Sequence, residues 1–174
     1  MNDSVIQTER LLLRRFRSSD ADFVLLLLNE PSFREYIGDK GVATMADAVA
    51  YIEQGPMANF EKFGYGALVV ERLEDGERAG MCGLFRRDSL DMPDLGFAML
   101  ARYFRLGYAT EASLGVIGWA RDTLRLPRLA AIVDDGNQRS RRLVEKLGFG
   151  FARRYRMPGE DSDLHCYTMD LGAG

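Results

Sequence analysis

The sequence is short of the residues from which metal sites and disulfide frameworks are built. It contains only two cysteines, Cys82 and Cys166, and one histidine, His165. These numbers exclude a disulfide framework and a four-ligand zinc site. A Cys–His nucleophilic pair is disfavoured, because His165 and Cys166 are neighbours and would face opposite sides of a strand. We expect two buried thiols in a reducing compartment, and no metal.

Long apolar runs and an excess of positive charge are missing as well. The longest apolar run, residues 23–28, is far shorter than the roughly 20 residues that cross a bilayer. The first four residues lack the features of a secretory signal. The net charge is -3, so no broad basic surface is available for nucleic acid. These absences favour a cytoplasmic protein whose partner is neither a membrane nor a nucleic acid.

The pattern of the chain indicates an α/β fold with one mixed, mostly antiparallel sheet flanked by helices. The 174 residues, 47% of them apolar, show no repeat or linker, so we expect a single domain over residues 1–174. Apolar patterning predicts strands over residues 8–15, 64–71, 79–87, 94–100, 129–133, 149–157 and 164–171. It predicts helices over residues 20–29, 44–57, 106–124 and 137–147, with a short helix and loop in 32–41.

The junction between the strand at 94–100 and the helix at 106–124 is the most informative stretch. A helix start presents unpaired amides and the positive end of its dipole. Arg102 and Arg105 add charge there, and Gly107 and Ala109 let a ligand approach the backbone. The stretch fits an anion site such as one for pyrophosphate, and it fits equally well an ordinary corner with solvated arginines. The P-loop and the Gly-x-Gly-x-x-Gly fingerprint are both absent.

A second group of polar residues begins the helix at 137–147. Asn137 occupies the position of a helix N-cap, and Ser140 falls in the first turn. The spacing favours capping for Asn137 over, or beside, a contact with an extended ligand. Ser140 could offer its hydroxyl to a leaving group.

These motifs together resemble the GNAT superfamily of acyl-CoA-dependent N-acyltransferases. The resemblance rests on Gly107-Tyr-Ala-Thr-Glu-Ala112, on Asn137-x-x-Ser140 and on Glu145-Lys-Leu-Gly-Phe149. With Thr8-Glu-Arg-Leu-Leu-Leu-Arg14, the branch that the chain resembles is that of the ribosomal-protein-alanine N-acetyltransferases. The likeness runs from residue 8 to residue 171.

The resemblance implies a sheet that splays between its fourth and fifth strands, here 94–100 and 129–133. Acetyl-CoA, the cosubstrate, would place its pantetheine arm in the splay and its pyrophosphate on residues 102–109. Asn137 would contact the pantetheine arm, and Ser140 would lie near the thioester sulfur. The residues thereby expected to bind acetyl-CoA are Phe97, Met99, Leu100, Arg102, Arg105, Leu106, Gly107, Tyr108, Ala109, Thr110, Asn137 and Ser140.

One residue departs from the pattern of the superfamily, Gln/Arg-x-x-Gly-x-Gly/Ala, because Arg105 replaces its first glycine. If this position needs a positive φ, Arg105 imposes a strain cost. If the position needs only a small residue, Arg105 can turn outward and help to neutralise phosphate.

The reaction that the resemblance implies is direct attack of a primary amine on the acetyl thioester in a ternary complex. A base must take the amine proton, and we expect Asp94, at the start of the fourth strand, to do so. Gly96 and Ala98 would share its face and leave room for a substrate. Asp94 could instead be an exposed turn residue. Ser140 is the leading acid for the thiolate, ahead of the weaker candidates Tyr103, Tyr155 and Tyr167.

The acceptor side of the expected site is harder to read. The resemblance implies that residues 33–41 lie in the region that walls the acceptor site, where Phe33 and Tyr36 could line a pocket or only pack. The resemblance implies an amine acceptor, either a protein N-terminus or a small molecule. Base rates for small soluble enzymes allow a homodimer. The alternative function is an acyl-CoA-binding or sensing module with little catalytic activity.

Overall fold

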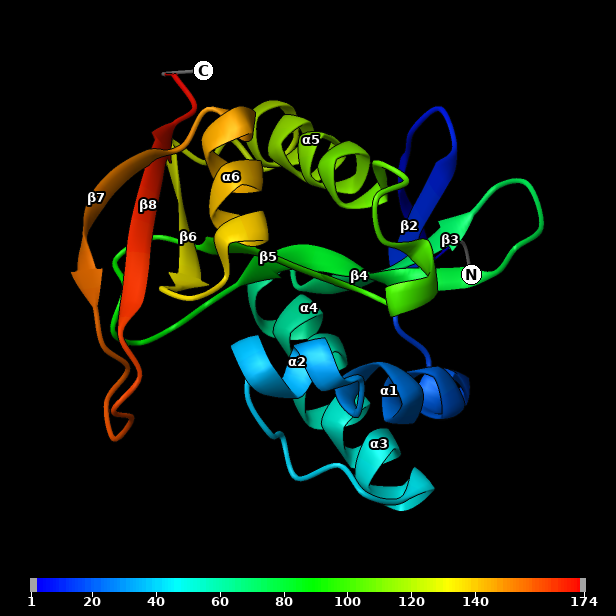
Figure 1. The fold of residues 1–174 in the computed structure, drawn as a ribbon. Helices are drawn as coiled ribbons and strands as arrows, with labels where there is room; N and C mark the ends of the chain where they lie inside the picture. Colours follow the sequence, from blue (N-terminus) through cyan, green and yellow to red (C-terminus); the bar gives the residue numbers. More distant parts are fainter. Residues whose placement is uncertain (1–2, 173–174) are drawn as a thin grey trace.

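The fold is an eight-stranded sheet with helices on both faces, and the computed structural model describes residues 3–172 (Figure 1). Its strands are β1 (Ser4–Gln7), β2 (Leu11–Arg15), β3 (Ala67–Arg72), β4 (Arg78–Phe85), β5 (Asp94–Met99), β6 (Arg128–Asp134), β7 (Gly150–Tyr155) and β8 (Leu164–Asp170). Its α-helices are α1 (Ala21–Leu28), α2 (Pro31–Tyr36), α3 (Met45–Ile52), α4 (Ala58–Phe63), α5 (Tyr108–Asp122) and α6 (Gln138–Leu147). Shorter turns are η1 (Ser18–Asp20), η2 (Glu53–Met57) and η3 (Ala101–Tyr103).

The sheet consists of two antiparallel halves joined by one parallel contact. Its strand order is β1-β2-β3-β4-β5-β6-β8-β7. Strands β1 to β5 pair antiparallel, as do β6, β8 and β7, whereas β5 and β6 run parallel. The register between β5 and β6 holds a single pair, Asp94 opposite Ala130. The predicted mixed, mostly antiparallel sheet with a splay between these two strands is therefore confirmed.

The helices divide between the two faces of the sheet. Figure 1 shows α5 and α6 on one face and α1 to α4 on the other. Helix α5 packs closely because Ala112, Val116 and Ala120 recur every four residues and are fully buried. The face of β6 and β8 that is turned away from α6 is covered instead by the loop 86–93, whose Leu90 packs with Ala130, Tyr155 and Cys166. Both cysteines are buried free thiols, as expected.

The strand predicted over residues 8–15 is in fact two strands and a tight turn. Thr8 N–H donates to Leu11 O (2.9 Å), and Leu11 N–H donates to Thr8 Oγ1 (3.1 Å). This turn lets β1 fold back on β2, and Ile6 packs against Gly115 of α5. Because one predicted strand is two, the numbering shifts by one. The strands that the resemblance makes fourth and fifth are β5 and β6.

The helix predicted over residues 44–57 begins as expected and then changes type. Thr44 and Asp47 form a capping box at the start of α3. Residues 53–57 form a π-helical turn that contains Pro56, and α4 follows it. The widened turn accommodates a residue that has no N–H to donate. Because α4 runs to Phe63, β3 begins at Ala67, later than predicted.

Candidate functional site

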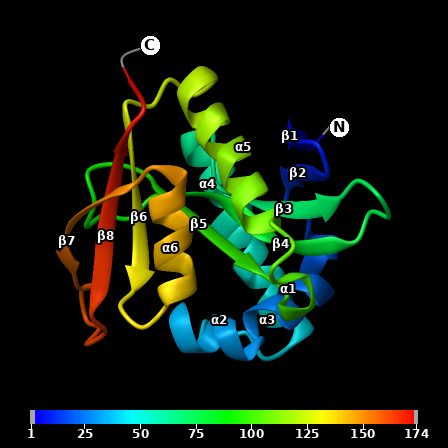
Figure 2. The same cartoon turned by 45° about the horizontal axis from the view of Figure 1, so that its top comes forward.

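The divergence of β5 from β6 creates the setting for a site. Ala130 N–H donates to Pro93 O (2.9 Å), and Asp94–Ala130 is the sole pair between the two strands in the described part of the chain. Beyond it β5 leads to η3 and α5, and β6 leads to α6. In Figure 2 the two strands separate toward the N-terminal end of α6, and α2 lies below the opening. The edge of β5 that faces β6 is thus left free to pair with something else.

The loop that joins β5 to α5 has the shape of an anion cradle. Arg105 has a φ of 65° and Gly107 a φ of 83°, and Gly107 occupies the N-cap position of α5. These two left-handed residues turn the chain so that α5 begins beside the end of β5. The first amides of a helix have no partner within it and attract anions. Two alternatives were open for Arg105, a strained positive φ or an outward turn in a relaxed backbone. Its φ is positive, so this arginine carries backbone strain.

The cradle is held from behind by Arg10, a residue that sequence reasoning assigned no role. Its Nη1 donates to Leu106 O (2.9 Å), and its Nε donates to Glu111 Oε2 (2.7 Å). Glu111 also accepts from Thr8 Oγ1 (2.6 Å). The turn between β1 and β2 is thus bonded directly to the start of α5. The Thr8-Glu-Arg10 motif was the signal for this contact, although no pairing could be read from it.

The residues expected to bind acetyl-CoA fall into three classes by burial. Met99, Leu100 and Tyr108 are buried in the core, so only their backbone groups can reach a ligand. Phe97, Ala109, Thr110, Asn137 and Ser140 are half-buried, whereas Arg102, Arg105, Leu106 and Gly107 are exposed. Arg102 pairs with Glu77 (3.2 Å) and lies over the Tyr103 ring (4.9 Å), so part of its charge is already engaged.

The start of α6 lies across the opening from this loop. Asn137 Oδ1 accepts from Ser140 N–H (3.2 Å), which confirms Asn137 as the N-cap of α6. Asp134 Oδ1 accepts from Gly136 N–H (2.8 Å) and fixes the preceding turn. Ser140 is half-buried in the first turn of the helix.

Asp94 stands at the point from which the strands diverge. Its side chain is 2 % exposed, which excludes the alternative of an exposed turn residue. Arg87 Nε lies 3.1 Å from Oδ1 and 3.2 Å from Oδ2 of Asp94. Burial raises the pKa of the Asp94 carboxyl to about 6, and the neighbouring Arg87 guanidinium limits this rise. A carboxylate that changes charge near neutral pH is suited to proton transfer.

The expectation that Gly96 leaves room for a substrate beside Asp94 is wrong in one respect. A Cβ at Gly96 would lie 2.6 Å from the Phe85 ring, so that ring already fills the space over the glycine. Ala98, two residues further along the same face, is half-buried. The open part of this face therefore lies toward the end of β5.

The weaker acid candidates have other partners. The Tyr155 hydroxyl is bonded to the Ser89 hydroxyl, and Tyr167 Oη donates to Glu145 Oε1 (3.1 Å). Tyr103 is buried against Tyr108. His165 lies on β8, with Nε2 2.7 Å from Asp135 Oδ1. Ser140, in the first turn of α6, therefore stays the leading candidate.

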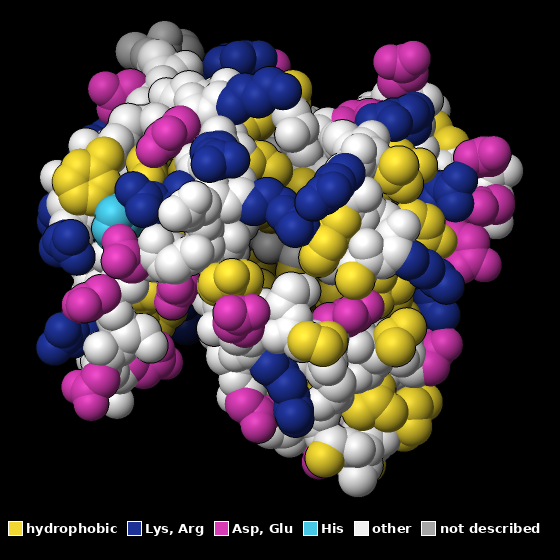
Figure 3. All heavy atoms as spheres, viewed as in Figure 1, with side chains coloured by type: hydrophobic (Ala, Val, Ile, Leu, Met, Phe, Trp, Pro, Cys, Tyr) yellow, Lys and Arg dark blue, Asp and Glu magenta, His cyan; other side chains and the backbone are white. Residues whose placement is uncertain are grey.

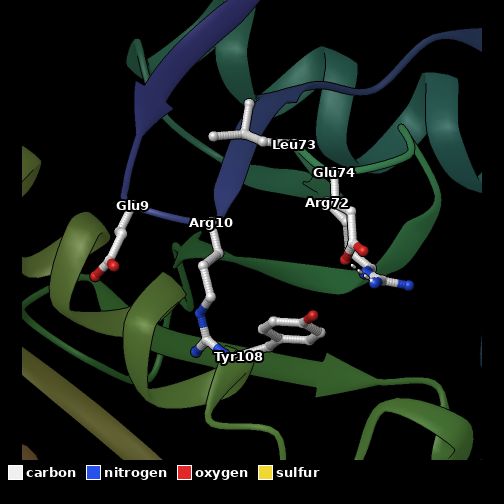
Figure 4. Close-up of a pocket in the computed structure, with 6 residues that line it drawn as sticks. All are labelled: Glu9, Arg10, Arg72, Leu73, Glu74 and Tyr108. Atoms are coloured by element: carbon white, nitrogen blue, oxygen red, sulfur yellow. Dashed lines mark hydrogen bonds and ion pairs between the residues drawn. The ribbon is translucent and has the colours of Figure 1, made fainter.

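A separate pocket of about 340 Å³ lies behind the cradle (Figure 4). Figure 4 shows the Arg10 guanidinium beside the Tyr108 ring, at a distance of 4.7 Å from the ring centroid. Both arginines of the pocket are already engaged, because Arg72 pairs with Glu74 and Arg10 with Glu111. We therefore assign this pocket to the support of the cradle and place the candidate site in the splay.

Figure 3 views the molecule from the side on which the splay opens. Lys and Arg side chains gather over α6 and toward the start of α5, above a hollow in the surface. Among residues 3–172, no cluster of three or more His, Cys, Asp or Glu side chains is arranged to hold a metal ion. The same residues contain no helix that is long and apolar enough to cross a membrane.

Comparison with known proteins identifies the fold. Residues 10–150 match the acetyltransferase (GNAT) domain family. The chain belongs to the GNAT superfamily. A GNAT relative from Bacillus subtilis, the uncharacterised N-acetyltransferase YoaA, is 26% identical over 172 residues, which cover 95% of this chain and 96% of that protein. The resemblance read from the sequence motifs is thereby confirmed at the level of the superfamily, and acetyl transfer is the general activity of this GNAT protein.

Solved GNAT structures share the arrangement. An acetyltransferase from Agrobacterium tumefaciens superposes with a TM-score of 0.79 at 27% identity, covering 94% of this chain and 92% of that one. The microcin C7 self-immunity acetyltransferase MccE, solved with acetyl-CoA and AMP, gives a TM-score of 0.82 at 17% identity, covering 98% and 97% of the two chains. At this identity the second likeness concerns the fold alone.

Proposed function

We propose that this protein transfers an acetyl group from acetyl-CoA to a primary amine by direct attack in a ternary complex. The observation that carries the proposal is the separation of β5 from β6 after the Asp94–Ala130 pair, with the start of α5 at the open end. Membership of the GNAT superfamily supports acetyl transfer. The likeness to MccE, which was solved with acetyl-CoA, supports the choice of cosubstrate.

The residues present fit this cosubstrate. The amides of Tyr108, Ala109 and Thr110 begin α5 and would donate to the pyrophosphate, with Arg102 and Arg105 adding charge. The free edge of β5 at residues 97–99 would pair with the amide groups of the pantetheine arm, whereas the Leu100 N–H already donates to Ala79 O (2.8 Å). Asn137 can keep its capping bond to Ser140 and offer its side-chain NH2 to the same arm, because the cap uses only Oδ1.

The chemistry divides among three groups of the protein. Acetyl-CoA supplies an activated thioester and a thiolate leaving group. Asp94 accepts the proton of the incoming ammonium, and because it is buried and short, we propose that a water molecule relays that proton. Backbone N–H groups of β5 stabilise the negative charge that develops on the thioester oxygen. The C–N bond would form as the C–S bond breaks. The Ser140 hydroxyl would give its proton to the departing sulfur and take up the second proton that the attacking nitrogen must lose to become an amide.

A second candidate, an acyl-CoA sensor with little turnover, is favoured by one observation. Both oxygens of Asp94 are engaged by Arg87, and the side chain has almost no contact with solvent. If this contact with Arg87 persists when the substrates bind, the carboxylate does not act as a base. The two functions share the cradle and differ in whether an amine consumes the thioester.

Release of free thiol separates the two functions. The protein is incubated with acetyl-CoA and a panel of primary amines that contains peptides with free N-termini, polyamines and amino acids. We expect thiol release that depends on one class of amine and a matching gain of 42 Da, roughly one acetyl group, on that amine. Binding without release for any amine supports the sensor, and no thermal shift with saturating acetyl-CoA would overturn both.

A matched pair of glycine variants tests whether the cradle binds the cosubstrate. Gly107 has a φ of 83° and Gly159, in a distant loop, a φ of 80°. Gly107→Ala and Gly159→Ala should each lower stability by about 1 kcal/mol through backbone strain. Only Gly107→Ala should weaken acetyl-CoA binding, by about tenfold or more, measured by calorimetry. Equal affinities in the two variants would place the cosubstrate elsewhere.

A further inference from the structure

A contact between Arg139 and Phe104 spans the open end of the splay. Arg139 belongs to the first turn of α6, and its guanidinium carbon lies 4.4 Å from the centroid of the Phe104 ring. Phe104 lies between η3 and Arg105, within the loop that forms the cradle. The contact therefore joins the two elements between which the cosubstrate would have to pass.

The charge of Arg139 is otherwise uncommitted. Its side chain is exposed, and no carboxylate of residues 3–172 lies within ion-pairing distance of it. Its neighbour Arg141 differs, because that guanidinium donates to Tyr167 Oη (3.3 Å) and to Asp135 O (3.2 Å). Arg102 likewise pairs with Glu77. Arg139 is thus a guanidinium at the opening that is held only by an aromatic ring.

Such a contact is weaker than the one that a phosphate would offer. An exposed cation–π contact contributes little, whereas a guanidinium donates two parallel, charge-assisted hydrogen bonds to a phosphate. The Arg139 side chain has enough rotatable bonds to leave the ring without any movement of α6. Exchange of the ring for a phosphate is therefore favourable when a bound phosphate lies within reach of the guanidinium.

We propose that Arg139 is a phosphate-binding residue that leaves the Phe104 ring and pairs with a phosphate of the coenzyme from the α6 side of the opening. The proposal rests on acetyl-CoA as the cosubstrate. It gives the coenzyme a cation from α6 in addition to those of the β5–α5 loop, and it leaves the Phe104 ring free to contact the bound coenzyme. Both the pyrophosphate and the 3′-phosphate of the coenzyme offer the required chemistry.

The test compares Arg139→Gln with Arg153→Gln. Arg153 is a matched control, because it is an exposed arginine of β7 that also lies over a ring, that of Tyr155 (5.2 Å), and β8 and β6 separate it from the splay. Affinities for CoA and for 3′-dephospho-CoA are measured by calorimetry at two salt concentrations. We expect Arg139→Gln to weaken CoA binding by about tenfold, the loss of one charge-assisted contact, and Arg153→Gln to leave it within about twofold.

The two ligands show which phosphate Arg139 contacts. If it is the 3′-phosphate, Arg139→Gln should bind 3′-dephospho-CoA as well as the unaltered protein does. If it is the pyrophosphate, the tenfold loss should persist with that ligand. Equal losses in Arg139→Gln and Arg153→Gln would show only a general effect of net charge and would overturn the proposal.

Phe104→Leu separates exchange from a fixed structural role. If Arg139 leaves the ring on binding, removal of the ring should not weaken the charge contact, and the Arg139→Gln effect should remain tenfold in the Phe104→Leu background. If the stacked pair itself shapes the site, the second substitution should add nothing to the first, and the proposal fails. Failure of the unaltered protein to bind CoA would instead refute the proposed function, which keeps the two failures distinct.

Discussion

At the scale of single residues, Asp94 combines deep burial with a charge that titrates near neutral pH. Burial raises its pKa to about 6, and the Arg87 guanidinium favours the charged form. A base works when it is deprotonated, so kcat/KM should rise with pH through about 6 in addition to any limb from the amine itself. Asp94→Asn should lower kcat/KM at pH 7 by about a hundredfold and remove the limb near pH 6. A pH–rate profile of both proteins checks this.

The stability of the same variant shows whether a loss of activity reflects chemistry. The pKa of folded Asp94, about 6, lies above its usual 3.8, so the folded state binds the proton more tightly than the unfolded chain does. The stability that this proton contributes is present below pH 3.8 and is lost as pH rises through about 6. Asp94→Asn should therefore melt no lower than the unaltered protein at pH 7. Arg87→Gln, which removes the cation, should move the limb in kcat/KM to higher pH.

Ser140 is expected to act on the leaving group and not on binding. Ser140→Ala should lower kcat by about tenfold, because the thiolate must then leave without a nearby donor, and should keep the Kd for acetyl-CoA within about twofold. Ser140→Thr retains a hydroxyl and should recover most of the activity. Single-turnover kinetics together with calorimetry make the comparison. An unchanged kcat in Ser140→Ala would assign the proton to water.

Arg105 carries backbone strain at the cradle. Its φ of 65° is matched by Arg125, with a φ of 55°, which lies beyond the C-terminal end of α5. Arg105→Gly and Arg125→Gly should each raise the free energy of unfolding by about 0.5–1 kcal/mol, since glycine adopts this conformation without a clash. Only Arg105→Gly should also weaken acetyl-CoA binding, because it removes a charge beside the amides of α5. Thermal melts and calorimetry of the pair measure both effects.

At the scale of elements, the start of α6 combines a cap with a proposed ligand contact. Asn137→Ala should cost about 1 kcal/mol of stability through loss of the cap. Asn137→Ser keeps a capping oxygen and should cost much less, yet its side chain lacks the NH2 proposed to reach the pantetheine arm. Reduced acetyl-CoA affinity in both variants, with reduced stability in Asn137→Ala alone, would support the two roles. Normal affinity in Asn137→Ser would leave Asn137 as a cap only.

Elements with strong local signals could be read from the sequence, whereas those set by distant contacts could not. The caps at Thr44 and Asn137 and the glycine after α6 are local rules, and they place α3 and α6 correctly. Strand β1 forms because the chain turns at Thr8 and because the strand packs on α5. The four residues of β1 carry no sequence signal for either contact. The Asp94–Arg87 contact is likewise invisible in the sequence, since it depends on the approach of the loop 86–93 to β5.

At the scale of the whole molecule, the two half-sheets are joined through one parallel pair and through the helices above them. A ligand in the splay would pair with β5 and bridge to α6, so its binding free energy adds to the stability of the folded state. Acetyl-CoA at 100 times its Kd should raise that stability by about 2.7 kcal/mol. A matching rise in Tm with ligand concentration would support a site that exists only in the folded protein.

Hydrogen exchange can show where that stabilisation acts. Amides at the free edge of β5, within residues 97–99, and at the start of α5 should exchange readily without ligand and slow strongly with acetyl-CoA, because both sets gain acceptors. Amides in the β1–β2 ladder, such as those of Ile6 and Leu13, already have partners and serve as the internal control. The Gly107→Ala substitution disturbs the cradle and leaves the splay intact. In this variant the slowing of amide exchange by acetyl-CoA should be lost first at the start of α5. Slowing that is uniform over the sheet, or confined to β7 and β8, would show that the cosubstrate does not lie between β5 and β6.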